Sequence, residues 1–134
     1  MSAVLADTHA VVWYLGTPGK LTAAATAALD GATQAGAPIY VASISVIEVL
    51  YLVEKGRLLP LALARLLNAL DDPHSGLVPV TLDLAIVQAM PRIAYTAVPE
   101  MPDRIIAATA LYLGVPLVTR DLRIRASGIT TIWS

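Results

Sequence analysis

Two aspartates follow short apolar runs of the kind that form buried strands. Asp7 comes directly after Val4–Ala6, and Asp121 follows the run Pro116–Thr119 after one intervening residue. Ligands of open parallel sheets bind beyond the carboxyl ends of the strands, so acids at two such ends could share one site. Each aspartate could also act only as the cap of the next helix, which is the more frequent role of a single aspartate there. Two acids at one sheet edge favour the shared site.

Glu48 lies in the segment SVIEVLYLV, whose pattern predicts a helix that is apolar on almost every side and therefore buried. A buried carboxylate is costly unless it is paired or bound to a metal, so something must compensate its charge. Ser45 precedes Glu48 by three residues. It lies either on the same helix face or at the helix start, where the two residues would form a capping box.

A charged pair opens the apolar segment MPDRIIAATALYLG, residues 101–114. Pro102 suits the first turn of a helix, and Asp103 complements the positive end of the helix dipole. Arg104 is unfavourable in a first turn by up to about 1 kcal/mol, so nearby negative charge must offset it. The pair is therefore expected to mark the rim of an acidic pocket.

Four acids, Asp7, Glu48, Asp103 and Asp121, converge in this interpretation, and without matching bases they would repel one another. The chain has no cysteine and only two histidines, so any metal here would be held by oxygen. Mg2+ and Mn2+ prefer such ligands, lower the pKa of a bound water and stabilise charge on phosphoryl oxygens. The predicted chemistry is cleavage of a phosphodiester.

Arg120, Arg123 and Arg125 form a short basic strip beside Asp121. The strip suits contacts with phosphates, to which Arg104 could add, and a plain solvated turn explains the strip equally well. Because the formal net charge is only −1, attraction to nucleic acid would have to come from a local patch of this kind.

Three further side chains near Asp7 have a structural interpretation as well as a functional one. His9 could act as a general base, but a structural role is the more frequent one in the first turn of an apolar helix. Trp13 and Tyr14 are expected in the core rather than as platforms on which bases stack.

Alternating strands and helices must position these groups. Strands are expected at Ala3–Ala6, Ile39–Ala42, Leu77–Val80, Pro116–Thr119 and Thr130–Trp133. Helices are expected at Thr8–Leu15, Thr22–Ala35, Ser45–Arg57, Leu61–Leu70, Leu82–Met90, Asp103–Leu113 and Leu122–Ala126. This alternation predicts an α/β fold, a three-layer α/β/α sandwich around a short parallel sheet, built as a single domain over residues 1–134.

Composition excludes several classes of protein. Although 57% of the 134 residues are hydrophobic, the longest apolar stretch, Ile105–Val118, is interrupted by Gly114 and Pro116 and is too short to span a bilayer. The N-terminus lacks the basic and apolar regions of a signal peptide, so we expect a cytoplasmic protein without a membrane partner. Neither a Gly-rich dinucleotide turn nor a Walker loop is present.

The segments LADTHAVVWYL, ISVIEVLYLVEKGRL, MPDRIIAATALYLGVPLVTRD and IRASGITTIW, in this order and spacing, resemble the PIN-domain proteins, specifically the VapC-type toxins of bacterial toxin–antitoxin pairs. The resemblance implies a Mg2+- or Mn2+-dependent endoribonuclease whose four acids fall on Asp7, Glu48, Asp103 and Asp121. It also places the hydroxyl of Thr119 near the metal. One departure is the segment PEMPD, where relatives often have Asp-Pro-x-Asp, and the role of Glu100 is left open.

The resemblance also implies partners: an RNA substrate, a VapB-like antitoxin and a second copy of the chain in a homodimer. The helix Ser45–Arg57 and its successor through Leu70 independently carry more apolar surface than a small domain can easily cover.

Two other functions remain open from the residues alone. The first is a non-catalytic α/β binding or scaffold module whose acids only cap helices. The second is a receiver-like phosphotransfer domain, which needs a phosphate-pairing lysine after a strand. Lys20 and Lys55, the only lysines, are poorly placed for that task.

Overall fold

The structure is a computed structural model that describes residues 2–134. Its centre is a sheet of five parallel strands in the order β3-β2-β1-β4-β5. The strands are β1 (Val4–Ala6), β2 (Ile39–Ala42), β3 (Leu77–Val80), β4 (Leu117–Val118) and β5 (Thr131–Ile132). The helices are α1 (Thr8–Gly16), α2 (Ala23–Gln34), α3 (Ser43–Glu54), α4 (Pro60–Asp71), α5 (Leu84–Ala89), α6 (Met101–Leu113) and α7 (Leu122–Arg125), with short 3-10 turns η1 (Pro18–Lys20) and η2 (Met90–Arg92).

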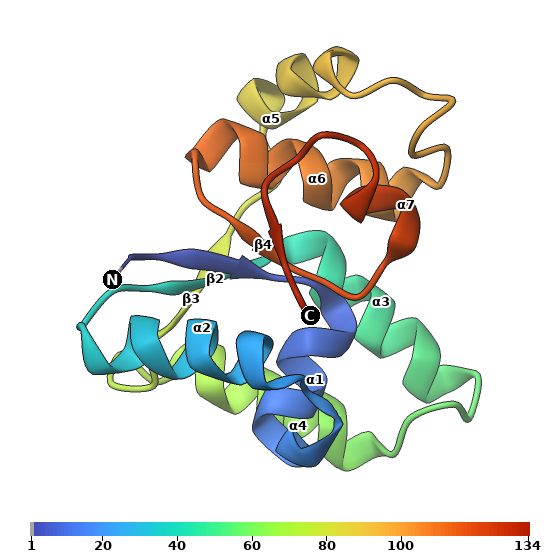
Figure 1. Ribbon diagram of the computed structural model, residues 1–134. Coiled ribbons are helices and arrows are strands. Elements are labelled where there is room, and N and C mark those ends of the chain that lie inside the picture. The colour runs from blue at the N-terminus through green and yellow to red at the C-terminus, as the bar shows by residue number, and fades with distance from the viewer. Residues whose placement is uncertain (1) are drawn as a thin grey trace.

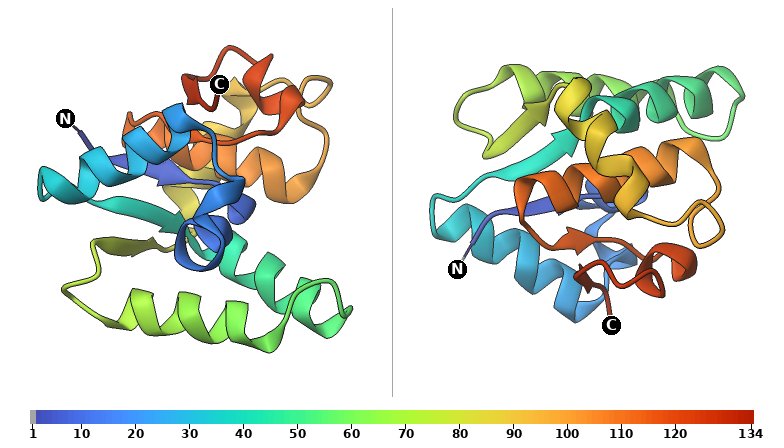
Figure 2. Two further views of the ribbon diagram at one scale, coloured as in Figure 1. Left: turned by 60° about the horizontal axis from the view of Figure 1, so that its bottom comes forward. Right: turned by 90° about the horizontal axis from the view of Figure 1, so that it is seen from above.

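Helices cover both faces of the sheet, as Figure 1 and the two turned views in Figure 2 show. The alternation along β1 explains the two cores, because successive strand residues point to opposite faces. Val4 and Ala6 pack with buried residues of α1, α2 and α4, whereas Leu5 packs with α5, α6 and α7. All three strand residues are at most 4% exposed. The predicted three-layer α/β/α fold with a parallel sheet is confirmed.

The strand order reverses at β1. The chain builds β1, β2 and β3 outward in one direction, then crosses to place β4 on the other side of β1. Such a reversal opens a crevice at the carboxyl ends of the two central strands. Asp7 directly follows β1 and Asp121 follows β4, so the topology brings both to the crevice.

Helix α3 differs from the expectation of a helix buried on almost every side. Only Ser45 and Val49 are buried among its residues, while Ile47 is 48% and Tyr51 is 56% exposed. The helix packs against α4 and α6 at the end of the sheet (Figure 1). Its exposed apolar side chains leave one face open to solvent.

Helix boundaries also differ in two informative places. Helix α3 begins at Ser43 rather than Ser45, and its N-cap is Ala42, which makes no side-chain cap hydrogen bond. Ser45 therefore lies inside the helix, and the capping box with Glu48 is not formed. Helix α6 begins at Met101, so Pro102 lies in its first turn as predicted. No helix in residues 2–134 has the length and apolarity needed to cross a membrane.

Candidate active site

The four predicted acids meet at the carboxyl edge of the sheet. A pocket of about 270 Å³ is lined by all of them together with residues of the first turn of α1 and with Arg120. Four different segments supply the acids: the end of β1, the second turn of α3, the first turn of α6 and the loop after β4. The complete lining is Asp7, Thr8, His9, Ala10, Glu48, Asp103, Arg120 and Asp121.

Asp7 is fixed through both of its carboxylate oxygens. Oδ1 accepts a hydrogen bond from the backbone N–H of Thr8 at 2.7 Å, which caps α1, and Oδ2 accepts one from the Thr119 hydroxyl at 2.5 Å. Burial raises the pKa of Asp7, and these two hydrogen bonds act against that rise. The buried Thr119 hydroxyl therefore supports Asp7 directly.

Glu48 reaches Thr8, a residue that the sequence did not single out. The Thr8 hydroxyl donates to Glu48 Oε1 at 2.6 Å and lies 3.0 Å from the hydroxyl oxygen of Ser45, one helical turn before Glu48. Thr8 is 3% and Ser45 is 0% exposed. Burial raises the pKa of Glu48, the Thr8 hydrogen bond lowers it, and the charge of Asp7 raises it. The signal for this contact in the sequence is the hydroxyl residue directly after Asp7.

Asp103 has the most perturbed environment of the four acids. Burial, followed by the negative charges of Asp121, Asp7 and Glu48, raises its pKa from 3.8 to about 7. Glu100 adds a smaller effect of the same sign. Asp103 thus carries an electrostatic cost that an additional cation at this position would remove.

Asp121 combines the two roles that the sequence left as alternatives. Its Oδ1 accepts hydrogen bonds from the backbone N–H groups of Arg123 at 2.9 Å and Ile124 at 3.0 Å, so it caps α7. It also lines the acidic pocket with Asp7 and Asp103. Capping a helix and belonging to the acidic site are therefore compatible here.

The acids share a pocket without forming a finished metal site. In residues 2–134, no group of three or more histidine, aspartate or glutamate side chains is already arranged to hold a metal ion. Oxygens of Asp7, Glu48 and Asp121 are instead turned toward hydroxyl and backbone donors.

Arg104 differs from its predicted role. Its guanidinium donates to the backbone carbonyls of Ile93 and Met90, both at 3.2 Å, and lies over the ring of Tyr95. It is therefore held against η2 and the loop that follows, and these carbonyls, rather than the acids alone, compensate its charge. These contacts occupy part of the Arg104 guanidinium, and its predicted contact with an RNA phosphate stays a prediction.

The remaining cations of the strip lie around α7. Arg120 is exposed and lines the acidic pocket, Arg123 is exposed, and Arg125 donates to the hydroxyl of Ser134 at 3.1 Å. Burial, and then the positive charge of Arg120, lowers the pKa of His9, which also lines the pocket. The His9 ring packs at a tilt near Trp13, with ring centroids 5.5 Å apart.

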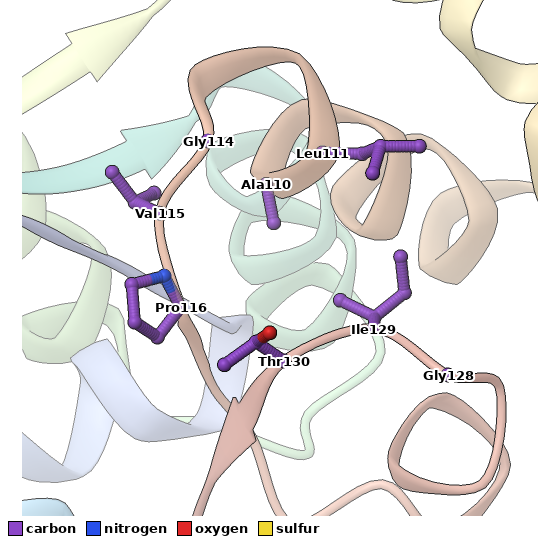
Figure 3. A pocket seen from close by; sticks show the side chains of 8 residues that line it. All are labelled: Ala110, Leu111, Gly114, Val115, Pro116, Gly128, Ile129 and Thr130. Carbon is purple, nitrogen blue, oxygen red and sulfur yellow. The ribbon is translucent and has the colours of Figure 1, made fainter.

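A second cavity, of about 320 Å³, lies at the amino ends of β4 and β5, opposite the acidic pocket (Figure 3). It is formed by the end of α6 and by the segments that lead into β4 and β5. Thr130 is its only side chain with a polar group, so the cavity offers no acid or base. Its lining is Ala110, Leu111, Gly114, Val115, Pro116, Gly128, Ile129 and Thr130.

Comparison with known proteins gives one consistent class. The model of the PIN domain family matches residues 4–128. Ribonuclease VapC22 of Mycobacterium tuberculosis is 32% identical over 127 residues, which span 94% of this chain and 92% of the relative. The chain therefore belongs to the PIN-domain family, and within that family it is of the VapC type.

Solved structures agree on the fold. A chain in the crystal structure of VapBC2 from Rickettsia felis, bound to a promoter DNA fragment, superposes with a TM-score of 0.71 at 16% identity, covering 98% of this chain and 97% of the other. A chain of DNA-bound VapBC from Salmonella typhimurium gives a TM-score of 0.65 at 22% identity, with the same coverage of each chain.

Proposed function

We propose that this chain is a metal-dependent endoribonuclease, the toxin of a toxin–antitoxin pair, which acts in the cytoplasm. The family membership supports the general class, because the relative from Mycobacterium tuberculosis is a ribonuclease. The observation that carries the proposal is that four carboxylates line one pocket, where burial and then the neighbouring negative charges raise the pKa of Asp103 to about 7.

The donor set fits a hard divalent cation such as Mg2+ or Mn2+, because oxygen ligands and concentrated negative charge are what these ions select. Asp7, Glu48, Asp103 and Asp121 are the residues proposed to hold it, because a carboxylate oxygen that accepts one hydrogen bond keeps a further lone pair for a cation. Such an ion, when bound, activates water and stabilises charge on phosphoryl oxygens.

The hydroxyls of Thr8 and Thr119 give the acids their orientation. Each donates to a carboxylate from a buried position, and the donor backbone is fixed by α1 or by β4. A carboxylate held in this way cannot swing freely into solvent, so the site pays less entropy when its ligand arrives. Arg120 supplies the positive charge at the pocket rim that an RNA phosphate requires.

An antitoxin segment has a surface suited to it beside the acids. A groove of about 430 Å³ shares His9 and Glu48 with the acidic pocket and continues over Ile47, Tyr51 and Met101. The solved relatives named VapBC are complexes, and we propose by analogy that a VapB-like partner lies over this groove. Exposed apolar side chains rimmed by polar ones are typical of such interfaces.

Two amide variants test the proposal. Asp7→Asn and Asp103→Asn should each abolish RNA cleavage at saturating RNA while circular dichroism shows an intact fold, because loss of a metal ligand affects turnover. Asp71→Asn, an exposed acid at the end of α4, is the matched control and should cleave like the wild type. Full cleavage by both pocket variants would mean that Asp7 and Asp103 do not hold a catalytic metal. Absence of cleavage by the wild type would instead favour a non-catalytic module whose acids only cap helices.

A further inference from the structure

Trp13 connects the acidic pocket to a set of basic side chains. The residue lies in α1, one turn after His9, and its side chain is 9% exposed. Trp133, near the C-terminus, supports it from another side, with ring centroids 6.1 Å apart. Figure 1 shows the C-terminal end of the chain next to α1. The ring is therefore a fixed platform beside the site.

Two cations from distant parts of the sequence rest on this platform. The guanidinium carbon of Arg120 is 4.6 Å and the ammonium nitrogen of Lys20 is 5.7 Å from the Trp13 ring centroid. Both distances are within the range of a cation–π interaction, for which tryptophan is the best aromatic partner. Both basic residues are exposed, so their charged groups remain accessible to a ligand.

Hydrogen bonds of the backbone fix the two segments that carry Lys20 and Arg120. Thr17 N donates to the Trp13 carbonyl at 2.8 Å and Lys20 N donates to Thr17 at 3.0 Å, which ties the η1 turn to the helix that carries the ring. On the other side, the N–H of Asp121 donates to the Thr119 hydroxyl at 3.0 Å, next to Arg120. The two cations are thus presented by rigid segments rather than by a free loop.

An anion would stabilise the two cations beside the Trp13 ring. Two like charges that share one ring repel each other, and both side chains are exposed to solvent. The Arg120 guanidinium covers a face of the Trp13 ring, so a nucleotide base cannot stack on that face. A ligand would contact the cations instead. Arg120 lines the acidic pocket as well, so the anion would sit next to the proposed site of cleavage.

We propose that Lys20 and Arg120, positioned by Trp13, form a clamp for a backbone phosphate of single-stranded RNA that neighbours the phosphate to be cleaved. The proposal rests on the proposed ribonuclease function and deepens it. Lys20 and Arg120 contact the substrate, whereas Trp13 is a positioning residue that acts through them. Arginine and lysine are the usual partners of phosphates in such contacts.

The test is the salt dependence of RNA binding in EDTA, measured by fluorescence anisotropy with a short fluorescein-labelled single-stranded RNA of mixed sequence. Each phosphate contact contributes about 0.7 to the slope of log affinity against log salt. Lys20→Ala and Arg120→Ala should each lower the slope, and the double variant, which loses the whole clamp on one phosphate, should lower it by about 0.7. Arg57→Ala, an exposed cation in the turn after α3, is the matched control and should keep the wild-type slope.

Variants of the ring separate positioning from charge. Trp13→Leu removes the platform without removing a charge, and it should lower the slope in a chain whose circular dichroism is unchanged. Trp13→Phe restores an aromatic face and should recover most of the slope. If Trp13→Leu does not fold, the slopes of the lysine and arginine variants still decide whether the clamp binds phosphate.

Cleavage of the same RNA with Mg2+ or Mn2+ distinguishes two failures. Unchanged slopes for Lys20→Ala and Arg120→Ala, in a chain whose wild type binds and cleaves RNA, overturn the clamp alone. A wild-type chain that neither binds nor cleaves RNA overturns the ribonuclease function and the clamp with it.

Discussion

Buried threonine hydroxyls donate hydrogen bonds to two of the four acids of this site. Asp7 and Glu48 each accept a hydrogen bond from a buried threonine, and such a bond favours the charged carboxylate against the effect of burial. Asp103 lies among the same negative charges, which together with burial raise its pKa to about 7. The acids are therefore unequal, and Asp103 is the one whose charge the protein compensates least.

Thr8 should act as a positioning residue for Glu48. Thr8→Val keeps the shape of the side chain but removes the donor at 2.6 Å, so it should lower the free energy of unfolding by about 1 kcal/mol. RNA cleavage should fall with it. Thr8→Ser retains the hydroxyl and should restore most of both properties, as measured by urea denaturation and by turnover. Equal activity of the valine and serine variants would exclude this role.

The raised pKa of Asp103 predicts a pH dependence of metal-free stability. Because its pKa is about 7 in the folded chain against an ordinary 3.8, the folded state holds this proton more tightly than the unfolded state. The resulting stabilisation is complete below the ordinary value and is lost as the pH rises through about 7. In EDTA, the melting temperature should therefore fall across this window.

Asp103→Asn should flatten that fall and melt at a higher temperature than the wild type at pH 7, because it removes a charge from among like charges. Asp7 and Glu48, whose pKa values are also raised, keep part of the dependence in the variant. Thermal melts of both chains from acid to neutral pH provide the measurement. Parallel melting curves would mean that Asp103 is not perturbed.

At the scale of elements, the convergence of the acids could be predicted because it depends on chain order and strand type. Apolar runs followed by Asp7 and Asp121 define strands whose carboxyl ends meet in a parallel sheet. The details of α3 could not be predicted, because an apolar sequence does not reveal which face a neighbouring helix will cover. The contacts of Arg104 depend on η2, a turn that sequence periodicity does not reveal.

Asp121 offers a way to separate the helix cap from the proposed metal ligand. Asp121→Ala removes the acceptor for two backbone N–H groups of α7 and should cost about 1 kcal/mol of stability. Asp121→Asn retains an acceptor oxygen and should cost only a few tenths of that amount. Both variants should lose RNA cleavage to the same extent, although their stabilities differ. Full activity in the asparagine variant would leave Asp121 with the capping role alone.

At the scale of the whole molecule, α3 and α4 present an apolar surface that the monomer does not cover. Tyr51 is 56%, Leu59 is 75% and Leu61 is 52% exposed. Surfaces of this kind mark sites of association in a soluble chain. Tyr51 lines the groove that shares His9 and Glu48 with the acidic pocket, so a partner bound there can also restrict access to the site.

We predict that the isolated chain is a homodimer and that it also forms a tight complex with an antitoxin over this face. Tyr51→Glu places a charge in the apolar surface and should shift sedimentation toward the monomer or abolish antitoxin binding. Leu84→Glu, at a position that is 69% exposed on α5, is the matched control and should change neither. A strict monomer at micromolar concentration, with no partner co-purifying from the native operon, would contradict the prediction.

The central claim is that four carboxylates at the carboxyl edge of the sheet hold a divalent cation with which the chain cleaves RNA. Its most direct test is cleavage of RNA by the purified chain in excess EDTA and after titration with Mg2+ or Mn2+ beyond the chelator. The account predicts no product in EDTA and full recovery with either ion, because the acids alone provide neither an activated water nor charge stabilisation. Undiminished cleavage in excess EDTA would contradict it.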